Sequence, residues 1–439
     1  MAILKKVGVI SLGCDKNRVD TEKMLALLSQ KYQLTPDIEK ANIIIVNTCA
    51  FLESARKEAI EEILSASLYK EHGVLEKLIV TGCLPQKFID ELKDELVEVD
   101  AFLGVSDYDK LLDVIKTCYN GERVNAVGKP KGEPCTDRVL TTSNYAYLKI
   151  ADGCFNRCSY CLIPYIRGNY RSVPRNDIFE EVKKLGDVNE LILVAQDTTR
   201  YGADVKDGYD IVDLIRDISS MKNVKNIRLL YCYPEGITDK LINEFKTNDK
   251  LIKYIDMPLQ HADDAILKSM RRRGTKQGYL EIINRLKSEV DGIAIRSTFI
   301  AGFPGETDEH FANLLDFISK AQLFNAGFFR YSREKGTPAY DFDGQVCERV
   351  KYNRVRKLYS LQKSISRNNL KSFKGNTLSV VTEGFDDERL LYYGRAYFNA
   401  PDIDGRVYFT APFPIEYGTS YDIKVVKTTD YDLFGQAKD

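Results

Sequence analysis

A-D-G-C-F-N-R-C-S-Y-C-L-I-P-Y-I-R-G, residues 151–168, contains three closely spaced cysteines, Cys154, Cys158 and Cys161. Thiolates this close in sequence can bind one face of an iron–sulfur cluster. A cubane cluster normally takes four cysteines, so three would leave one iron open to a small molecule. The alternatives are a structural zinc site or a disulfide pair. Structural zinc needs four protein ligands, and the next cysteine is Cys232. The spacing therefore favours a cluster.

The pattern C-x3-C-x2-C, with the aromatic Tyr160 before its last cysteine, resembles that of radical S-adenosylmethionine (SAM) enzymes. In that family the open iron binds the amino and carboxylate groups of SAM. The resemblance implies that the three cysteines are catalytic as well as metal ligands, and that Tyr160 contributes to cofactor binding.

The same resemblance assigns SAM contacts farther along the chain. Gln196 would meet the SAM amino group. Arg296 would meet the carboxylate, since arginine binds carboxylates through a two-pronged fork. The turn that contains Gly302 and Gly305 would flank the adenine or ribose. Where many radical SAM enzymes have Gly-Gly-Glu, this chain has Ala-Gln-Asp at 195–197, so the Gln196 contact departs from the common pattern.

Length and composition limit the possible classes of protein. The chain has 439 residues, enough for two or three domains, and a formal net charge of −1. That charge does not indicate a protein that binds nucleic acid over its whole surface. No signal-peptide pattern and no membrane-length apolar run is found, so we expect a cytoplasmic protein without a membrane partner. Its ten cysteines then favour metal ligands or buried thiols over disulfides.

The N-terminal segment, residues 1–134, repeats a strand–loop–helix pattern. Apolar runs at Val7–Ile10, Ile43–Val46 and Leu78–Val80 lead into Cys14, Cys49 and Cys83. The pattern predicts a parallel α/β sheet, in which the carboxyl ends of the strands form the binding edge. One cysteine there would be ordinary core packing. Three in equivalent places predict a second cluster with three thiolate ligands.

The middle segment, residues 135–373, alternates six strand-like runs with helical patterns and ends in a long amphipathic helix. The runs are Tyr145–Ile150, Leu191–Ala195, Ile227–Tyr231, Tyr254–Met257, Ile293–Ile300 and Ala326–Tyr331. They predict a partial, open (β/α)6 TIM-like barrel with its active site at the carboxyl ends of the strands. The basic run Arg271–Arg273 is expected to be a solvated face.

The C-terminal segment, residues 374–439, changes in composition. Strand-like runs at Leu378–Val381, Leu390–Phe398, Val407–Phe409 and Tyr421–Val426 predict a small all-β, OB-like barrel. From Gly375 onward the segment has six basic and eleven acidic side chains, a net charge of −5. Such a surface repels phosphate and attracts a basic protein. The alternative is that this acidity serves solubility alone.

Three motifs in the N-terminal segment resemble those of the methylthiotransferase family of radical SAM enzymes: S-L-G-C-D-K-N-R-V-D at 11–20, N-T-C-A-F at 47–51 and T-G-C-L-P-Q at 81–86. The C-terminal segment resembles a TRAM domain. The resemblance covers the whole chain and implies two [4Fe–4S] clusters and SAM as cofactors. The second cluster would lie on Cys14, Cys49 and Cys83, with a free iron that carries sulfur.

Two kinds of methylthiotransferase are candidates. One modifies adenosine in tRNA; the other, the RimO type, modifies the β-carbon of an aspartate in small-subunit ribosomal protein twelve. A-Q-D-T-T-R-Y-G at 195–202 and D-L-F-G at 432–435 resemble the RimO type. The implied partners are a basic ribosomal protein, docked on the acidic C-terminal domain, and a reducing electron donor; nucleic acid is disfavoured. A non-enzymatic iron–sulfur scaffold or adaptor on ribosomes is the alternative from another class.

Overall fold

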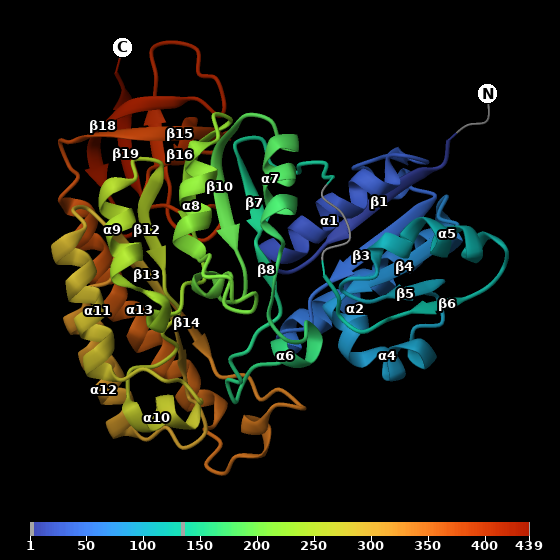
Figure 1. Ribbon diagram of the computed structural model, residues 1–439, viewed down its shortest axis with the longest axis horizontal. Helices are drawn as coiled ribbons and strands as arrows, with labels where there is room; N and C mark the ends of the chain where they lie inside the picture. Colours follow the sequence, from blue (N-terminus) through green and yellow to red (C-terminus); the bar gives the residue numbers. More distant parts are fainter. Residues whose placement is uncertain (1–3, 133–136, 439) are drawn as a thin grey trace.

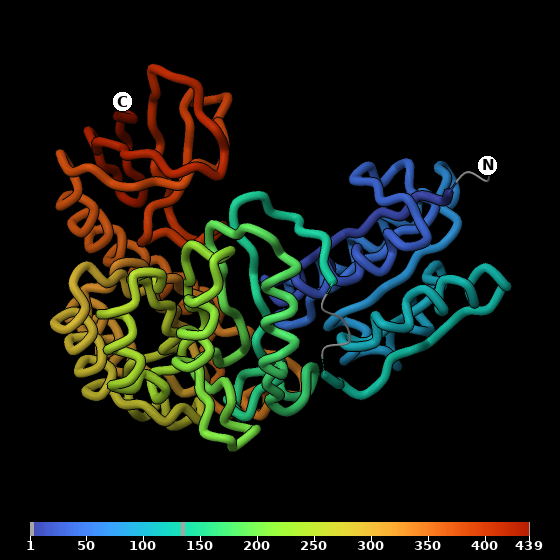
Figure 2. The backbone as a smooth tube through the Cα atoms, turned by 45° about the horizontal axis from the view of Figure 1, so that its top comes forward, coloured from blue at the N-terminus to red at the C-terminus, as the bar shows by residue number. Residues whose placement is uncertain are grey.

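A computed structural model describes residues 4–132 and 137–438, so the predicted boundary between residues 134 and 135 lies outside the described residues. The chain forms three lobes in sequence order (Figures 1 and 2). An N-terminal α/β lobe lies on one side of a central α/β lobe, and a β-barrel lies at one end of it. Within the described ranges, no helix has the length and apolar composition needed to cross a membrane.

The N-terminal lobe is built on a six-stranded parallel sheet with the order β2-β1-β3-β4-β5-β6. The strands are β1 (Lys6–Ser11), β2 (Gln33–Leu34), β3 (Ile43–Thr48), β4 (Lys77–Gly82), β5 (Ala101–Leu103) and β6 (Val124–Ala126). The predicted parallel sheet is confirmed. Because β1, β3 and β4 are neighbours, the three cysteines that follow them share one edge of the sheet.

Helices follow these strands closely. They are α1 (Asp15–Leu28), α2 (Glu53–Ser67), α3 (Tyr69–His72), α4 (Cys83–Glu95) and α5 (Leu111–Tyr119). Helix α1 begins directly after Cys14, and α4 begins at Cys83 itself. Two of the three cysteines therefore lie at the amino-terminal ends of helices.

The central lobe has six parallel strands that pair in chain order, which confirms the predicted open (β/α)6 barrel. They are β7 (Tyr145–Lys149), β10 (Val188–Val194), β11 (Val224–Leu229), β12 (Leu251–Asp256), β13 (Ala294–Ala301) and β14 (Asn325–Arg330). The covering helices are α7 (Arg175–Lys184), α8 (Ile211–Ser220), α9 (Asp239–Thr247), α11 (Lys276–Glu289), α12 (Asp308–Ala321) and α13 (Glu348–Lys371). Short elements near the strand ends are β8 (Ala151–Asp152), α6 (Ile163–Ile166), β9 (Arg171–Ser172) and α10 (Asp264–Ser269).

The C-terminal lobe is a closed five-stranded barrel with the order β15-β16-β17-β19-β18. Its strands are β15 (Thr377–Asp386), β16 (Leu391–Arg395), β17 (Val407–Thr410), β18 (Ser420–Thr428) and β19 (Leu433–Ala437). The predicted small all-β barrel is confirmed. The closing strand β19 was not predicted.

Buried charges join this barrel to the central sheet. Glu190 on β10 accepts hydrogen bonds from Arg228 on β11 and from Arg395 on β16, at 2.5 and 2.8 Å. Although burial opposes it, the two guanidinium groups hold the pKa of Glu190 below its usual value. In both views the C-terminal barrel lies at the end of the central lobe away from α6 and α10 (Figures 1 and 2).

Candidate active site

The cysteines of the N-terminal lobe meet where β1, β3 and β4 end. Gly13 precedes Cys14 with φ +96°, and a Cβ at Gly13 would lie 2.7 Å from the Cβ of Cys49. The chain before Cys14 therefore approaches Cys49 more closely than any residue but glycine allows. Cys83 lies near both other thiols, since each of them raises its pKa. The structure thus brings together three cysteines that are widely separated in sequence.

Arg167 lies beside this N-terminal triad. Burial raises the pKa of Cys83 to about 12, and Arg167 opposes the rise. Its Nη2 lies 3.8 Å from the Sγ of Cys83, and its Nη1 donates to the Oδ2 of Asp152 at 2.9 Å. Asp152 lies two residues before Cys154. A single buried arginine therefore links the N-terminal triad to the loop that holds the second set of cysteines.

The loop after β8 holds Cys154, Cys158 and Cys161, the barrel triad. The Cys154 amide donates to the carbonyl of Gly168, which closes the loop around α6. Burial raises the pKa of Cys154 to about 11, and Cys158 adds to the rise. Burial also raises the pKa of Cys161 above its usual value, again with a contribution from Cys158. The three thiols thus face one another at the carboxyl end of the first barrel strand.

The geometry of each triad limits the kind of metal centre that it can bind. In the described ranges, no three His, Cys, Asp or Glu side chains converge closely enough for a single metal ion. A cubane cluster binds each thiolate through a different iron, so its ligands surround a body rather than a point. Each triad brings together three thiols, the number that a cubane with one open iron takes and one fewer than the four ligands of structural zinc.

A cavity of about 930 Å³ lies between the two lobes. On one side it is lined by Phe51 and Leu52, which closely follow Cys49 in the chain. On the other it is lined by Tyr160, from the barrel triad, and by Thr298 and Ile300 on β13. One cavity therefore contacts a cysteine loop of each lobe, and its volume lies within the range of small-molecule sites.

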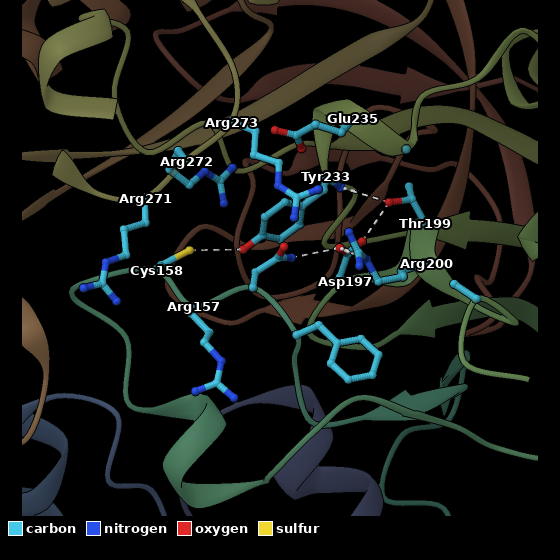
Figure 3. A pocket seen from close by; sticks show the side chains of 14 residues that line it. Arg157, Cys158, Asp197, Thr199, Arg200, Tyr233, Glu235, Arg271, Arg272 and Arg273 are labelled. Carbon is cyan, nitrogen blue, oxygen red and sulfur yellow. Dashed lines mark hydrogen bonds and ion pairs between the residues drawn. The ribbon is translucent and has the colours of Figure 1, made fainter. Parts of the chain in front are cut away.

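A second cavity, of about 510 Å³, lies beside the barrel triad and is lined by Cys158 and Tyr233 (Figure 3). Arg271, Arg272 and Arg273 also line it. The expectation that these three arginines form a solvated face is wrong for Arg272, which is buried; Arg271 and Arg273 are exposed. The backbone explains the difference, because the chain leaves α10 here with Arg271 at φ +57°, so the side chains do not share one face.

Gln196 and Arg296, both predicted to contact SAM, differ in whether they have polar atoms free to bind a ligand. Gln196 donates through Nε2 to Asp152 at 3.0 Å, while its buried Oε1 has no partner among the described residues. Arg296 is already paired: its Nη1 lies 2.7 Å from Asp256, and its Nε lies 3.6 Å from Asp404 of the C-terminal barrel. The amide oxygen of Gln196 remains available to an amino group, whereas a ligand carboxylate would compete with two protein carboxylates for Arg296.

The predicted glycine turn is held together from within. The carboxylate of Glu306 accepts from the amide of Gly302 at 2.7 Å, and Gly305 donates to the carbonyl of Gly344 at 2.9 Å. Gly302 has φ +80°, and a Cβ there would lie 2.3 Å from a side-chain carbon of Lys351. Packing against Lys351 accounts for Gly302 without a ligand. An adenine contact at this turn stays a prediction.

Two residues of the site escaped the sequence-based reasoning. Arg167 lies in the cysteine-containing segment 151–168, but no sequence spacing indicates that it contacts Cys83. Glu334 is buried after β14, and it accepts from the amide of Glu53 at 2.9 Å and from Arg56 at 2.6 Å, both on α2. It ties the barrel to the N-terminal lobe next to the larger cavity. Contacts between lobes leave no periodic signal in a sequence.

Comparison with known families matches each lobe. The Radical SAM superfamily matches residues 148–318, Uncharacterized protein family UPF0004 matches 6–104, and the TRAM domain matches 375–437. The Ribosomal protein uS12 methylthiotransferase RimO of Acetivibrio thermocellus is 46% identical over 446 residues, which cover 98% of each chain. The protein of the same name from Thermoanaerobacter sp. is 44% identical, covering 99% of this chain and all of that one. The chain belongs to the RimO family of methylthiotransferases. The family resemblance inferred from the motifs is confirmed.

Solved structures resemble the fold at low sequence identity. The radical SAM methyltransferase TsrM from Kitasatospora setae, with cobalamin and a [4Fe-4S] cluster bound, has a TM-score of 0.57 at 14% identity and covers 77% of each chain. The radical SAM enzyme OxsB, with aqua-cobalamin and SAM bound, has a TM-score of 0.52 at 13% identity and covers 82% of this chain and 62% of that chain. At this sequence identity, these matches support the radical SAM fold but not a particular reaction or substrate.

Proposed function

We propose that this protein is a radical SAM methylthiotransferase that adds a methylthio group to the β-carbon of an aspartate in small-subunit ribosomal protein uS12. One observation carries the proposal: a single cavity contacts a loop of each cysteine triad, so a substrate side chain inside it could reach both. The substrate is inferred from the full-length relatives, which are named for uS12. Ribosomes are the target, so we place the activity in the cytoplasm.

The residues that would hold the cofactors follow from the two triads. Cys14, Cys49 and Cys83 would bind one [4Fe–4S] cluster, and Cys154, Cys158 and Cys161 the other. When bound, the clusters and SAM supply the one-electron and sulfur-transfer chemistry that no side chain can provide. Tyr160 lies between Cys158 and Cys161 in the sequence and lines the larger cavity. We propose that Tyr160 and the free Oε1 of Gln196 orient SAM.

The chain itself contributes the positions of the reacting groups. The cavity is lined by apolar side chains from both lobes, including Phe51, Ile300 and Phe329. Glu334, on the cavity wall, joins the lobes through Arg56, and Arg167 joins them beside Cys83 by donating to Asn17 at 2.7 Å. A substrate side chain enclosed by both lobes would be kept in reach of the two triads, and such positioning lowers the barrier of a reaction by holding the reactants together.

We further propose that the basic substrate protein docks on the acidic C-terminal barrel. Only part of the negative charge of that barrel is available for this. Asp404 accepts from Tyr254 at 2.7 Å, and Asp430 pairs with Arg367 at 2.6 Å, both partners in the central lobe. Asp402 is exposed but lies 3.6 Å from Arg18 of the N-terminal lobe. The exposed acidic residues that remain for a partner are Asp387, Glu388, Glu416 and Asp422. Because this barrel lies away from α6 and α10, these residues would bind a part of the substrate other than the modified aspartate.

A reducing electron donor is the second partner we propose. Arg157, Arg271 and Arg273 are exposed around the cavity that Cys158 lines (Figure 3). None of them forms an ion pair with the described residues. Three unpaired cations beside a cluster ligand would attract an acidic redox protein and bring it close to the cluster. We propose that the donor docks on this face.

Anaerobic reconstitution tests the proposed function. With reductant, SAM and a peptide or protein substrate containing the target aspartate, the enzyme should form 5′-deoxyadenosine and methylthio-aspartate. Replacing Cys14, Cys49 and Cys83 by alanine should abolish the methylthio product while SAM cleavage persists. A non-enzymatic scaffold would cleave no SAM.

The tRNA reaction remains the alternative within the wider family, and a deletion strain separates the two. Mass spectrometry should show uS12 without its methylthio group and tRNA unchanged. An intact modification on uS12 would refute the proposed substrate.

A further inference from the structure

The buried arginines of the protein differ in whether they form an ion pair with a carboxylate. Six arginines of the described chain have buried side chains: Arg138, Arg167, Arg228, Arg272, Arg354 and Arg395. Five of these form an ion pair with a carboxylate at 2.9 Å or less. Arg272 forms no ion pair with any described residue and is 6% exposed. A buried cation without a counter-ion is costly, so such a group points to an absent anion.

The hydrogen bonds of Arg272 lead to the same conclusion. Its Nη2 donates to the carbonyl of Pro258 at 2.5 Å, while Nε and Nη1 have no acceptor in the described chain. Its guanidinium lies over the ring of Tyr233, 4.2 Å from the centroid. Burial lowers the pKa of Arg272, whereas Tyr233, Tyr160 and Cys158 are the first three groups that raise it, and none of these is a carboxylate. Two donors of the fork are therefore left for a ligand.

The position of Arg272 is fixed relative to the barrel triad. The amide of Ser159, which follows Cys158, donates to the carbonyl of Met270 at 3.1 Å, and its hydroxyl donates to the carbonyl of Ser269 at 2.7 Å. These bonds hold the end of α10 against the cysteine loop, two residues before Arg272. Asp197 lies on the other side of the Tyr233 ring (Figure 3). Asp197 is already satisfied, since it lies 3.5 Å from Arg200 and accepts hydrogen bonds from Asn156 and Thr199. Arg272 is therefore the group on which this side of the barrel triad offers free donors to an anion.

We infer that Arg272, and not Arg296, binds the carboxylate of the methionyl part of SAM. The inference rests on the proposed function and deepens it. It replaces the sequence-based assignment because Arg296 already faces Asp256 and Asp404, whereas Arg272 has free donors beside the barrel triad. The rival explanation is that Arg272 neutralises the thiolates of the bound cluster and makes no contact with SAM.

Equilibrium binding of SAM and of decarboxylated SAM to the anaerobically reconstituted enzyme tests the inference. The two ligands differ only in the carboxylate. In Arg272→Gln we expect SAM affinity to fall by about tenfold to a hundredfold, as for a lost charged hydrogen bond, with decarboxylated SAM changed less than about threefold. The preference of the enzyme for SAM should then shrink by about tenfold or more. Arg296→Gln, the matched control, should keep the wild-type preference.

Several outcomes would overturn the inference. An unchanged preference in Arg272→Gln, or a preference lost in Arg296→Gln, would contradict it. A fall in iron content or an altered cluster spectrum in Arg272→Gln, with the preference intact, would assign Arg272 to the cluster. If Arg272→Gln does not fold, Arg272→Lys keeps the charge without the fork and should show an intermediate preference; equal losses for both ligands would refute the inference. Wild-type protein that binds neither ligand would instead refute the proposed function.

Discussion

At the scale of single residues, Gly13 shows how the N-terminal triad depends on close approach of the backbone. Gly13 and Gly121 share a left-handed φ, at +96° and +93°, but only Gly13 has a neighbour that a Cβ would strike, the Cβ of Cys49. We expect Gly121→Ala to lose about 1–3 kcal/mol of unfolding free energy and to keep its iron. Gly13→Ala should show the same strain and also displace Cys49. Its iron content after reconstitution should fall from about eight to about four per chain. Equal iron content in the two variants would contradict this account of Gly13.

The cysteines could be predicted from the sequence, whereas the arginines could not. Cys154, Cys158 and Cys161 are separated by fixed short spacings, and a cluster needs its ligands at just such spacings. An arginine acts through what faces it in space. The sequence does not reveal that Arg296 is paired with two carboxylates while Arg272 has none. Assigning the SAM contacts therefore required the tertiary structure.

At the scale of elements, Glu334 fastens α2 to the loop after β14. Its side chain is buried and accepts from the first amide of α2 and from Arg56. Glu334→Gln removes the charge from both bonds, which should cost about 1–3 kcal/mol and loosen the start of α2 beside the larger cavity. Hydrogen–deuterium exchange should be faster at residues 53–57. The control is Glu348→Gln, at a side chain that is 66% exposed. Exchange at α2 that is equally fast in both variants would rule out this role for Glu334.

The elements predicted correctly are those with strong periodic signals. All six barrel strands were predicted, because parallel strands buried on both faces appear as continuous apolar runs. The strands that were missed are short or polar: β2, β5, β6, β8, β9 and β19. Strand β19 includes Gly435 and Gln436, and its parallel pairing with β17 closes the barrel. Such pairing is decided by partners distant in sequence, which no local pattern reports.

At the scale of the whole molecule, the acidic C-terminal barrel should bind the basic substrate through charge. A variant with four substitutions removes the exposed acids: Asp387→Asn, Glu388→Gln, Glu416→Gln and Asp422→Asn. We expect its affinity for uS12 to fall on the order of tenfold at low salt, with the difference shrinking as salt rises. A control with the same change in net charge alters α4 instead: Asp90→Asn, Glu91→Gln, Asp94→Asn and Glu95→Gln. A loss of affinity that is equal in both variants would show that only net charge matters.

The exposed arginines around Cys158 should set the rate at which an electron donor reduces the cluster bound by the barrel triad. Reversing Arg157, Arg271 and Arg273 to glutamate leaves the buried Arg272 in place and turns an attractive face into a repulsive one. Reduction of the barrel cluster by an acidic redox protein should slow by about tenfold or more at low ionic strength, and the difference should fade at high salt. Photoreduction by a deazaflavin, which needs no docking, should be unaffected. The matched control reverses three exposed cations of α13: Arg349→Glu, Arg356→Glu and Lys357→Glu. If the control slows reduction equally, or if the first variant is reduced at the wild-type rate, the donor docks elsewhere.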